Sequence, residues 1–556
     1  MTNAQRLSES SPEVAAEART YSGLPVKDSY TPADIRHIDY DTDIGDVGAY
    51  PFTRGIHPGG YRTKSWTQRL QAGYGSPADT NERWRYYLKE GLTGLNIELD
   101  IASHMGLDAD HPRVVKEVGL QGVSIGSLRD MQILTEGIRL DQISLVMQSQ
   151  AFSSPVMLAF YVALVERQGL ELAPLRVTII NDPLLSYWCG GLVDKVDTLD
   201  LGVKLAVDVV EYCTRHLPRA YCLYVDSYNH RELGMTAIDE AGWCFAKAKY
   251  YVDRVLERGL GVDEFAPRIT FFCSAHIDFF EEIAKLRAMR RMWARLMREH
   301  YGAQNPRSLQ FRFAVETAGS SLTQQQPINN IIRITTEALS AVLAGAQAVT
   351  PACYDEGICL PSEEAATVSI RTQQILAYET GVTNVADPLG GSYYVEHLTD
   401  RMEQEINKAL ARIEERGGVL ETMKSGWFDQ QWEASAYEYA QRMERGERIV
   451  VGVNAFTTEE EDSTFSTFRP SAHSITDHVE AVKRFKAGRD QAKLRDALAQ
   501  LRGKAECHDV NLIPAMVEAA KSDATREEII GVIREAYGLS YDPFGLRESP
   551  LPPRRG

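Results

Sequence analysis

The sequence predicts an α/β protein whose main domain is a (β/α)8 barrel, with an N-terminal arm and a C-terminal helical region. Two observations support this fold class. Eight short β-rich runs alternate with helical segments between residues 65 and 352. The chain of 556 residues is 44% apolar, which is enough to form the core of one large domain and a smaller one. An open doubly wound sheet, which shows the same alternation, is the structural alternative.

Each β-rich run is followed by a segment with apolar residues at three- and four-residue steps, which is typical of an amphipathic helix. The strands are expected within residues 65–73, 94–100, 143–149, 176–182, 221–227, 269–274, 309–316 and 346–352. The active site of such a barrel lies at the carboxyl ends of the strands. The residues expected there are Gln71, Asp100 to His104, Asn181, Tyr228 to Glu232, Glu316 and Cys353 to Glu356.

Changes in composition and periodicity along the chain predict three parts. Residues 1–49 are polar and acidic with weak periodicity, and we expect them to form an arm rather than an independent fold. Residues 50–400 contain the barrel. Residues 401–556 are expected to be helical, with a polar loop at 457–474 and a frayed tail.

Composition and charge exclude several functional classes. Lys and Arg total 60 against 77 Asp and Glu, and the net charge of -17 disfavours binding to nucleic acid or an anionic membrane. No apolar run approaches the ~20 residues that cross a bilayer, and the N-terminus lacks a signal-peptide core, so a cytoplasmic protein is expected. The basic run at 287–298 is expected to be an amphipathic outer helix with a solvated face.

Short motifs are uninformative, because phosphate-loop, dinucleotide, zinc-protease and serine-hydrolase signatures are absent and the eight cysteines have no zinc-ligand spacing. Longer runs carry more information: YPFTRG (50–55), WTQRLQAGYG (66–75), DADHPRV (108–114), FAPRITFF (265–272), FFEEIAKLRAMRRMWARLM (279–297), SLTQQQPINNIIRI (321–334), ALSAVLAGAQ (338–347), RTQQIL (371–376) and VADPLGGSYYVE (385–396). From about Tyr50 to about residue 540, the chain resembles the large, substrate-binding subunit of the methylmalonyl-CoA, isobutyryl-CoA and 2-hydroxyisobutyryl-CoA mutase family.

The resemblance implies an isomerase that moves a carbon group between adjacent carbons by a radical route. It also implies a barrel that encloses the coenzyme A chain of an acyl-CoA substrate, with adenosylcobalamin capping the strand ends. In this family the cobalamin is held by a domain or small subunit with the motif D-x-H-x-x-G, which does not occur in these 556 residues. The resemblance therefore predicts a hetero-oligomer in which this chain shares the cofactor with a separate small cobalamin-binding subunit.

The residues at the reacting end depart from the family pattern. The resemblance places Tyr228 in register with a family Tyr and puts Asn229 where the family has a His. An Asn amide can polarise a thioester carbonyl by hydrogen bonding but cannot transfer a proton. His230, one residue later, is expected to point elsewhere.

Three further positions concern the acyl group. By the resemblance, Gln71 faces the migrating group, and Gly190 replaces the Arg that holds the free carboxylate in methylmalonyl enzymes. A methylmalonyl substrate would therefore lose its charge partner. Glu98 lies where the 2-hydroxyisobutyryl enzyme has a hydroxyl-binding Asp, which favours a hydroxyl or amino group on the acyl chain. A structural Glu98–Gln71 pair is the alternative.

Positions near the cofactor are partly retained. Glu356 matches the carboxylate that binds the adenosyl ribose, and His104 and Glu232 match family residues near the corrin. The departures are Ile180 and Glu316, each in place of Gln, and residues 350–352 in place of H-T-N.

Positions that match the family's coenzyme A contacts are better retained. Charged donors suit the phosphates of this group. The matching residues are Lys64, in place of Arg, and Arg268, Thr270 and Arg312, whereas two neighbouring contacts have become Val146 and Gln148.

The sequence thus predicts Tyr228, Asn229, Gln71, Glu98 and Glu316 as the catalytic set. Two alternatives stay open. The chain could be a cobalamin-independent CoA-thioester enzyme, such as a decarboxylase, lyase or hydratase, that uses Glu98, Glu316 or His230 as acid or base. It could also be a non-catalytic subunit.

Overall fold

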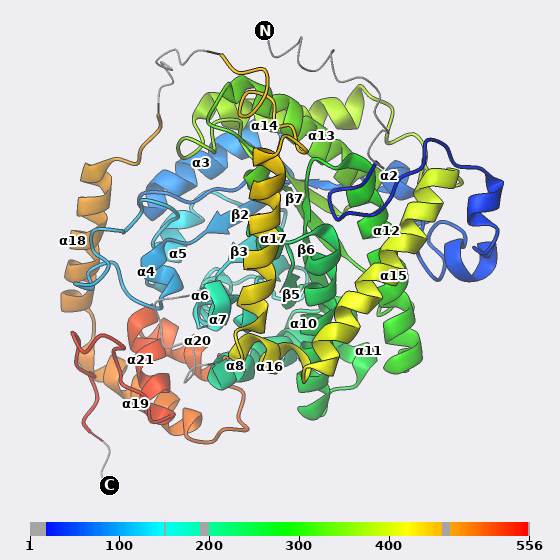
Figure 1. The fold of residues 1–556 in the computed structure, drawn as a ribbon. Helices are drawn as coiled ribbons and strands as arrows, with labels where there is room; N and C mark the ends of the chain where they lie inside the picture. Colours follow the sequence, from blue (N-terminus) through cyan, green and yellow to red (C-terminus); the bar gives the residue numbers. More distant parts are fainter. Residues whose placement is uncertain (1–17, 150–151, 190–198, 459–466, 554–556) are drawn as a thin grey trace. The chain divides into compact units, whose positions relative to one another are not determined.

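The computed structural model describes residues 18–149, 152–189, 199–458 and 467–553. Within them, eight parallel strands alternate with helices (Figure 1). The strands are β1 Thr67–Gln68, β2 Gly94–Glu98, β3 Ser144–Gln148, β4 Arg176–Ile179, β5 Leu223–Asp226, β6 Ile269–Ala275, β7 Phe313–Thr317 and β8 Ala348–Thr350. Each strand overlaps one of the eight β-rich runs of the sequence.

Strand neighbours follow the order of the chain. One parallel sheet has the order β1-β8-β7-β6-β5 and another the order β2-β3-β4. Thr178 of β4 forms a parallel bridge with Tyr221, just before β5. The Glu98 amide of β2 donates to the Ala72 carbonyl, just past β1, at 2.9 Å. This is the neighbour order of a (β/α)8 barrel, which confirms the predicted fold class, whereas a doubly wound sheet would reverse the order at a switch point.

The chain forms two compact units. The first takes residues 1–68, 226–250 and 271–468, and the second takes 69–225, 251–270 and 469–556. The three-part division at residues 49 and 400 stays a prediction. No helix of the described residues is both long enough and apolar enough to span a bilayer.

The first unit contains most of the carboxyl-end segments of the five-stranded sheet. Its helices are α2 Gly60–Thr63, α9 Tyr228–Glu232, α12 Phe279–Arg295, α13 Asn330–Leu343, α14 Glu363–Tyr378, α15 Tyr393–Glu415, α16 Gly418–Lys424 and α17 Trp427–Glu444. Short 3-10 helices lie at Pro32–Ile35, Gly319–Ser321 and Pro327–Asn329, and π-helical turns at Tyr40–Ile44 and Leu296–His300.

The second unit is built around the helix α6 Ser153–Arg167, whose residues 153–165 are all buried. A helix that is apolar all round must be enclosed by others. The other helices of this unit are α3 Pro77–Lys89, α4 Ile101–His104, α5 Leu128–Leu134, α7 Pro183–Cys189, α8 Leu199–His216, α11 Val262–Phe265, a 3-10 turn at Ala266–Arg268, α18 Ala472–Gly488, α19 Gln491–Ala505, α20 Ile513–Lys521 and α21 Arg526–Ala536. The helix α10 Ala237–Glu257 has residues in both units. The polar loop predicted to reach residue 474 ends earlier, where α18 begins.

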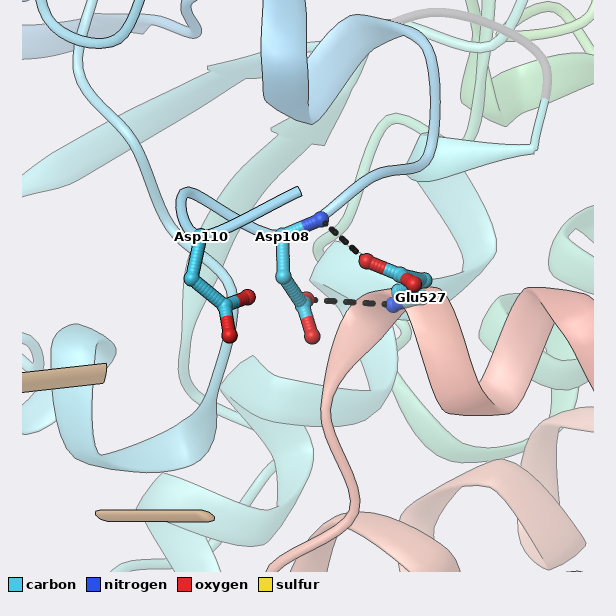
Figure 2. A group of neighbouring side chains, drawn as sticks. All are labelled: Asp108, Asp110 and Glu527. Carbon is cyan, nitrogen blue, oxygen red and sulfur yellow. Dashed lines mark hydrogen bonds between the residues drawn. The ribbon is translucent and has the colours of Figure 1, made fainter. Parts of the chain in front are cut away.

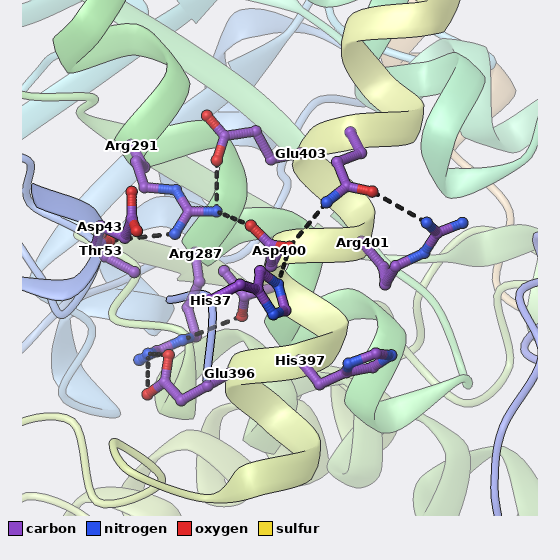
Figure 3. A network of polar contacts seen from close by, with 12 residues as sticks. His37, Asp43, Thr53, Arg287, Arg291, Glu396, His397, Asp400, Arg401 and Glu403 are labelled. Carbon is purple, nitrogen blue, oxygen red and sulfur yellow. Dashed lines mark hydrogen bonds and ion pairs between the residues drawn. The ribbon is translucent and has the colours of Figure 1, made fainter. Parts of the chain in front are cut away.

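The basic run on α12 is not solvated, so that expectation is wrong. Arg287, Arg290 and Arg291 are each 1% exposed. Arg287 pairs with Asp387 and binds both carboxylate oxygens of Glu396 at 2.7 and 2.9 Å. Figure 3 shows the Arg287–Glu396 contact and the neighbouring pairs of Arg291, in which the helix α15 supplies Glu396, Asp400 and Glu403. We call the α12 arginines and their partners the arginine network.

The described part of the N-terminal arm and the residues just after it complete the arginine network. Arg290 donates to the backbone carbonyls of Phe52 and Thr53 at 3.0 and 2.6 Å. Arg295 pairs with Asp43 at 2.6 Å, and His37 lies 2.9 Å from Asp400 of α15. The arginines are buried because the arm and α15 cover them with carboxylates and carbonyls, contacts that no periodicity in the run itself reveals.

Candidate functional site

A cluster of acids and one phenol lies at the carboxyl ends of β5, β7 and β8 in the first unit. Tyr228 and Glu232 are on α9, directly after β5, while Glu316 is on β7 and Glu356 follows β8. We call Tyr228, Glu232, Glu316 and Glu356 the strand-end cluster. Its positions agree with the sequence prediction that functional residues lie at the strand ends.

Tyr228 is the neutral member of the cluster. Its ring packs against Phe272 of β6 with centroids 5.1 Å apart. Desolvation raises the pKa of its hydroxyl well above the usual range, and the charges of Glu316, Glu232 and Glu356 raise it further. The hydroxyl therefore keeps its proton at neutral pH and can act as a hydrogen-bond donor.

Glu232 titrates near neutrality. Its carboxylate accepts hydrogen bonds from the Ser320 amide at 2.7 Å and the Ser320 hydroxyl at 3.1 Å. Burial nevertheless raises its pKa to about 7, with a further contribution from Glu356, against the lowering effect of Ser320 and Arg231. At pH 7 this carboxyl group is therefore close to half protonated.

Glu356 and Glu232 approach a common point. The Glu356 carboxylate accepts from the Cys353 amide at 3.1 Å. Desolvation by the surrounding protein raises the pKa of Glu356, although solvent still reaches its side chain. A Cβ atom placed on Gly319 would lie 3.2 Å from Glu232 Oε2, 3.6 Å from Glu356 Oε1 and 3.7 Å from the Tyr228 hydroxyl.

Asn229 is fixed by the residue that ends β5. Its backbone amide donates to Asp226 Oδ1 and its side-chain Nδ2 to Asp226 Oδ2, both at 3.0 Å. His230 is fully buried, and its ring lies edge-on to Phe428 of α17. Burial lowers the His230 pKa well below the usual range, with a further contribution from Lys247. His230 is therefore neutral and enclosed, which does not suit an acid or base that meets substrate.

In the second unit, two polar pairs lie at the ends of β1, β2 and β3. Gln71 Nε2 donates to Gln148 Oε1 at 3.0 Å. Glu98 Oε1 lies 3.1 Å from His104 Nε2, while the buried His104 Nδ1 has no hydrogen-bond partner among the described residues. Gln71 and Glu98 are thus each placed by another side chain.

The predicted coenzyme A residues lie at the opposite ends of the strands. Lys64, Arg268 and Arg312 precede β1, β6 and β7, which belong to one sheet, and Thr270 lies within β6. Lys64 is exposed, Arg268 donates to the Glu264 carbonyl at 2.5 Å, Arg312 donates to Gln310 and Thr270 is 8% exposed. The strands are parallel, so cations at their amino ends and acids at their carboxyl ends give the sheet an electrostatic polarity.

Sequence reasoning missed His57, which lies beside two of these cations. Burial lowers the His57 pKa, and repulsion from Arg312 and Lys64 lowers it further. His57 therefore marks Lys64 and Arg312 as neighbours in the first unit. A lone His gave no signal of this kind in the sequence.

One group of acids among the described residues has the spacing of metal ligands. Asp108, Asp110 and Glu527 offer oxygens within 4.8 Å of one another (Figure 2). Lys486 Nζ, however, lies 2.8 Å from Asp108 and 2.6 Å from Asp110, and Arg547 lies 3.1 Å from Asp110. The cluster is balanced by internal cations, so its contacts explain it without a metal ion.

Comparison with known proteins identifies the family. The sequence model of methylmalonyl-CoA mutase matches residues 19–539. The 2-hydroxyisobutanoyl-CoA mutase large subunit of Aquincola tertiaricarbonis is 39% identical over 97% of this chain and 94% of that subunit. Methylmalonyl-CoA mutase of Rhizobium meliloti is 36% identical over 93% of this chain and 72% of that enzyme, and the mitochondrial enzyme of Homo sapiens is 34% identical over 93% and 68%.

The chain belongs to the methylmalonyl-CoA mutase family. It is an acyl-CoA mutase by descent, and such enzymes are isomerases. The family uses adenosylcobalamin and CoA thioesters, and the residues described above fit both groups. Hydroxyls of an adenosyl ribose suit the converging oxygens of Glu232, Glu356 and Tyr228, and phosphates suit the cations at the amino ends of the strands.

Several family positions remain to be placed. Ile180 is 5% exposed, Val146 is 7% exposed and Thr350 is 1% exposed, so these departures lie in the core. Gly190 lies outside the described residues. Of the functional contacts that sequence reasoning missed, Ser320 and Asp226 hold Glu232 and Asn229 through hydrogen bonds that depend on the folded loops, while Gly319 contributes an empty position.

Proposed function

We propose that this chain is the substrate-binding catalytic subunit of an adenosylcobalamin-dependent acyl-CoA mutase. It performs a radical 1,2-rearrangement of the carbon skeleton of a CoA thioester other than methylmalonyl-CoA. A separate small subunit supplies the cobalamin-binding domain, as the name of the Aquincola relative, a large subunit, supports. The observation that carries the proposal is the polarity of the strand ends, with cations at the amino ends and the strand-end cluster at the carboxyl ends.

In the first unit, Lys64 and Arg312 offer the phosphates of the thioester charge-assisted hydrogen bonds. In the second unit, Arg268 and Thr270 are the corresponding donors by the family resemblance. These residues precede or begin their strands, so they bind the coenzyme A portion of the substrate rather than its reacting carbons. The thioester then extends toward the carboxyl ends.

At the reacting end, residues of this chain bind, orient and donate hydrogen bonds. Tyr228 keeps its proton because of burial and neighbouring carboxylates, so it can donate to a substrate oxygen without ionising. Asn229, held by Asp226, supplies a fixed amide where the family has a His. When bound, the cofactor supplies the carbon radical that starts the rearrangement.

The acyl group carries a hydrogen-bond donor, such as a hydroxyl or amino substituent. Glu98 and Gln71 are accepting or amphoteric groups at the strand ends of the second unit. Arg69, which directly follows β1, is buried and donates to the Leu95 carbonyl at 2.9 Å and the Ser144 hydroxyl at 2.6 Å, so its guanidinium is engaged by the protein itself. A carboxylate substituent would meet the like charge of Glu98, which is costly in a desolvated site. This supports a substrate other than methylmalonyl-CoA.

The test is reconstitution. The chain is mixed with a small D-x-H-x-x-G protein and adenosylcobalamin, and candidate CoA thioesters are added while cobalamin absorbance and product are followed. We expect an absorbance change that depends on substrate, with isomerised product. Turnover of a thioester without any cobalamin response would contradict the proposal and select a cobalamin-independent CoA-thioester enzyme.

A second experiment addresses Asn229. Asn229→His restores the residue of the family, and we expect it to retain or raise turnover of a simple acyl-CoA. Asp226→Asn is the matched variant, because it weakens the hydrogen bond that orients residue 229 while leaving that residue unchanged. Complete loss of activity in Asn229→His would show that the Asn has a task of its own.

A further inference from the structure

Gly319 occupies an unusual place in the strand-end cluster. It begins the 3-10 turn Gly319–Ser321 that follows β7, and its backbone does not adopt the positive φ that favours glycine. The conformation of the chain therefore permits any residue at this position. The absence of a side chain must have another cause.

That cause is the space beside the backbone. A Cβ atom would lie 3.2 Å from Glu232 Oε2, with Glu356 Oε1 at 3.6 Å and the Tyr228 hydroxyl at 3.7 Å. Glu232 Oε2 cannot easily move away, because it accepts a hydrogen bond from the Ser320 amide at 2.7 Å. An added methyl group would press on an oxygen that the next residue of the same turn holds in place.

Three polar groups from two segments, α9 and the loop after β8, therefore meet at a point that is kept free of side chain. Two are carboxylates that accept hydrogen bonds, and the third is a phenol that can accept or donate. Such a point suits a ligand with two neighbouring hydroxyl groups, because each hydroxyl can donate to one carboxylate and accept from a third group. A phosphate or carboxylate ligand would be repelled.

We propose that Gly319 is a specificity-determining residue, whose missing side chain admits a vicinal diol to the carboxylates of Glu232 and Glu356. The inference rests on the proposed function, in which that diol belongs to the adenosyl ribose. It adds a residue that acts by leaving space, whereas Glu232, Glu356 and Tyr228 act by contact. Replacing Gly319 should remove diol binding and leave the fold intact.

The experiment uses the full chain without the partner subunit, and its probes are adenosine and 2′,3′-dideoxyadenosine, which lacks the diol. Binding is measured by ligand-observed NMR or calorimetry for the wild type, Gly319→Ala and Gly503→Ala. Gly503 lies in α19 with nothing within 4 Å of an added Cβ, so it is the matched control. Thermal unfolding of each variant is recorded in parallel.

We expect the wild type and Gly503→Ala to prefer adenosine over the dideoxy compound. Gly319→Ala should bind adenosine at least tenfold more weakly and lose this preference, with a melting temperature close to that of the wild type. Equal adenosine binding by Gly319→Ala and the wild type would overturn the inference, as would a wild type that does not distinguish the two nucleosides.

A second measurement separates this inference from the proposed function. The reconstituted wild type and Gly319→Ala are compared for the cobalamin absorbance change on addition of substrate. A full response from both proteins would overturn the inference and leave the proposed function standing. A response that is present in the wild type and at least tenfold smaller in Gly319→Ala supports both.

Discussion

Buried charge along α12 is neutralised by opposite charge, whereas two carboxyl groups at the strand ends, Glu232 and Glu356, have raised pKa values and so hold their protons to higher pH. Arg287 has Glu396 and Asp387 as partners, and all three side chains are at most 3% exposed. The charges of Glu232, Glu316 and Glu356 all act on Tyr228, and desolvation is the first cause that raises the pKa values of Glu232 and Glu356. Both regions belong to the first unit.

The difference separates a structural role from a functional one. A matched buried ion pair has satisfied its hydrogen bonds and has no further binding capacity. A group of like charges with raised pKa values costs stability, and its polar atoms are arranged to receive a ligand. The arginine network therefore secures α12, α15 and the arm, while the strand-end cluster is the group that we propose for ligand binding.

The largest expected effect is the loss of an arginine from the network. Arg287→Ala leaves Glu396 and Asp387 buried without their cation, which should cost ~3 to 5 kcal/mol in the free energy of unfolding. Arg401→Ala on α15 is the control, because Arg401 is 38% exposed and its pairing with Glu405 contributes at most ~1 kcal/mol. Equal denaturant midpoints for the two variants would show that the network does not stabilise the fold.

A smaller effect on the free energy of unfolding is expected when Glu232 is replaced by a residue that does not titrate. The folded chain holds the Glu232 proton up to a pKa of about 7, whereas the ordinary value is 4.5. The contribution of this group to stability is therefore complete below pH 4.5 and is lost as pH rises through 7. Glu232→Gln has no such proton, and at pH 8 it should be up to ~3 kcal/mol more stable than the wild type.

Denaturant unfolding between pH 5 and pH 8 measures this difference. The gap between Glu232→Gln and the wild type should widen as pH rises and level off above pH 8. A gap that is constant with pH would mean that Glu232 is ionised throughout, and the contrast with the arginine network would fail.

The smallest expected effect concerns Glu337 of α13, which is fully buried. Burial raises its pKa well above the usual range, and Glu232 and Glu282 raise it further while Ser321 and Arg231 lower it. Glu337 is thus neutral at pH 7, and Glu337→Gln should change the free energy of unfolding by no more than about 0.5 kcal/mol.

Glu396→Gln is the matched comparison, because Glu396 is also buried but binds Arg287 through both oxygens. Loss of that charge should cost ~3 kcal/mol, since it leaves Arg287 partly unpaired. Similar costs for the two Glu→Gln variants at pH 7 would indicate that Glu337 is ionised.

The sequence was sufficient to predict the eight strands and to predict that the site lies at their carboxyl ends. Period and β-rich composition located all eight strands, and the barrel rule then placed Tyr228, Glu316 and Glu356 at carboxyl ends. These features depend on local pattern and on a general rule of topology. The family resemblance supplied the roles, which local pattern cannot provide.

Features that depend on partners far along the chain were not predictable. The basic run of α12 was expected to be solvated because periodicity does not reveal that Glu396, Glu403 and the arm cover it. The same holds for Ser320 on Glu232 and Asp226 on Asn229, since each hydrogen bond requires the folded loops. Gly319 carries no side chain, so the sequence does not show that a side chain at this position would approach Glu232, Glu356 and Tyr228.

The most direct test of the contrast is proton exchange on ligand binding. Adenosine is titrated into the wild type and Glu232→Gln by calorimetry at pH 7, in two buffers of different ionisation enthalpy. Binding to the carboxylate form should release up to about half a proton per wild-type chain, because the Glu232 pKa is about 7, and none from Glu232→Gln. Binding to the wild type without proton release would contradict the account, because the strand-end cluster would then not be the group that receives the ligand.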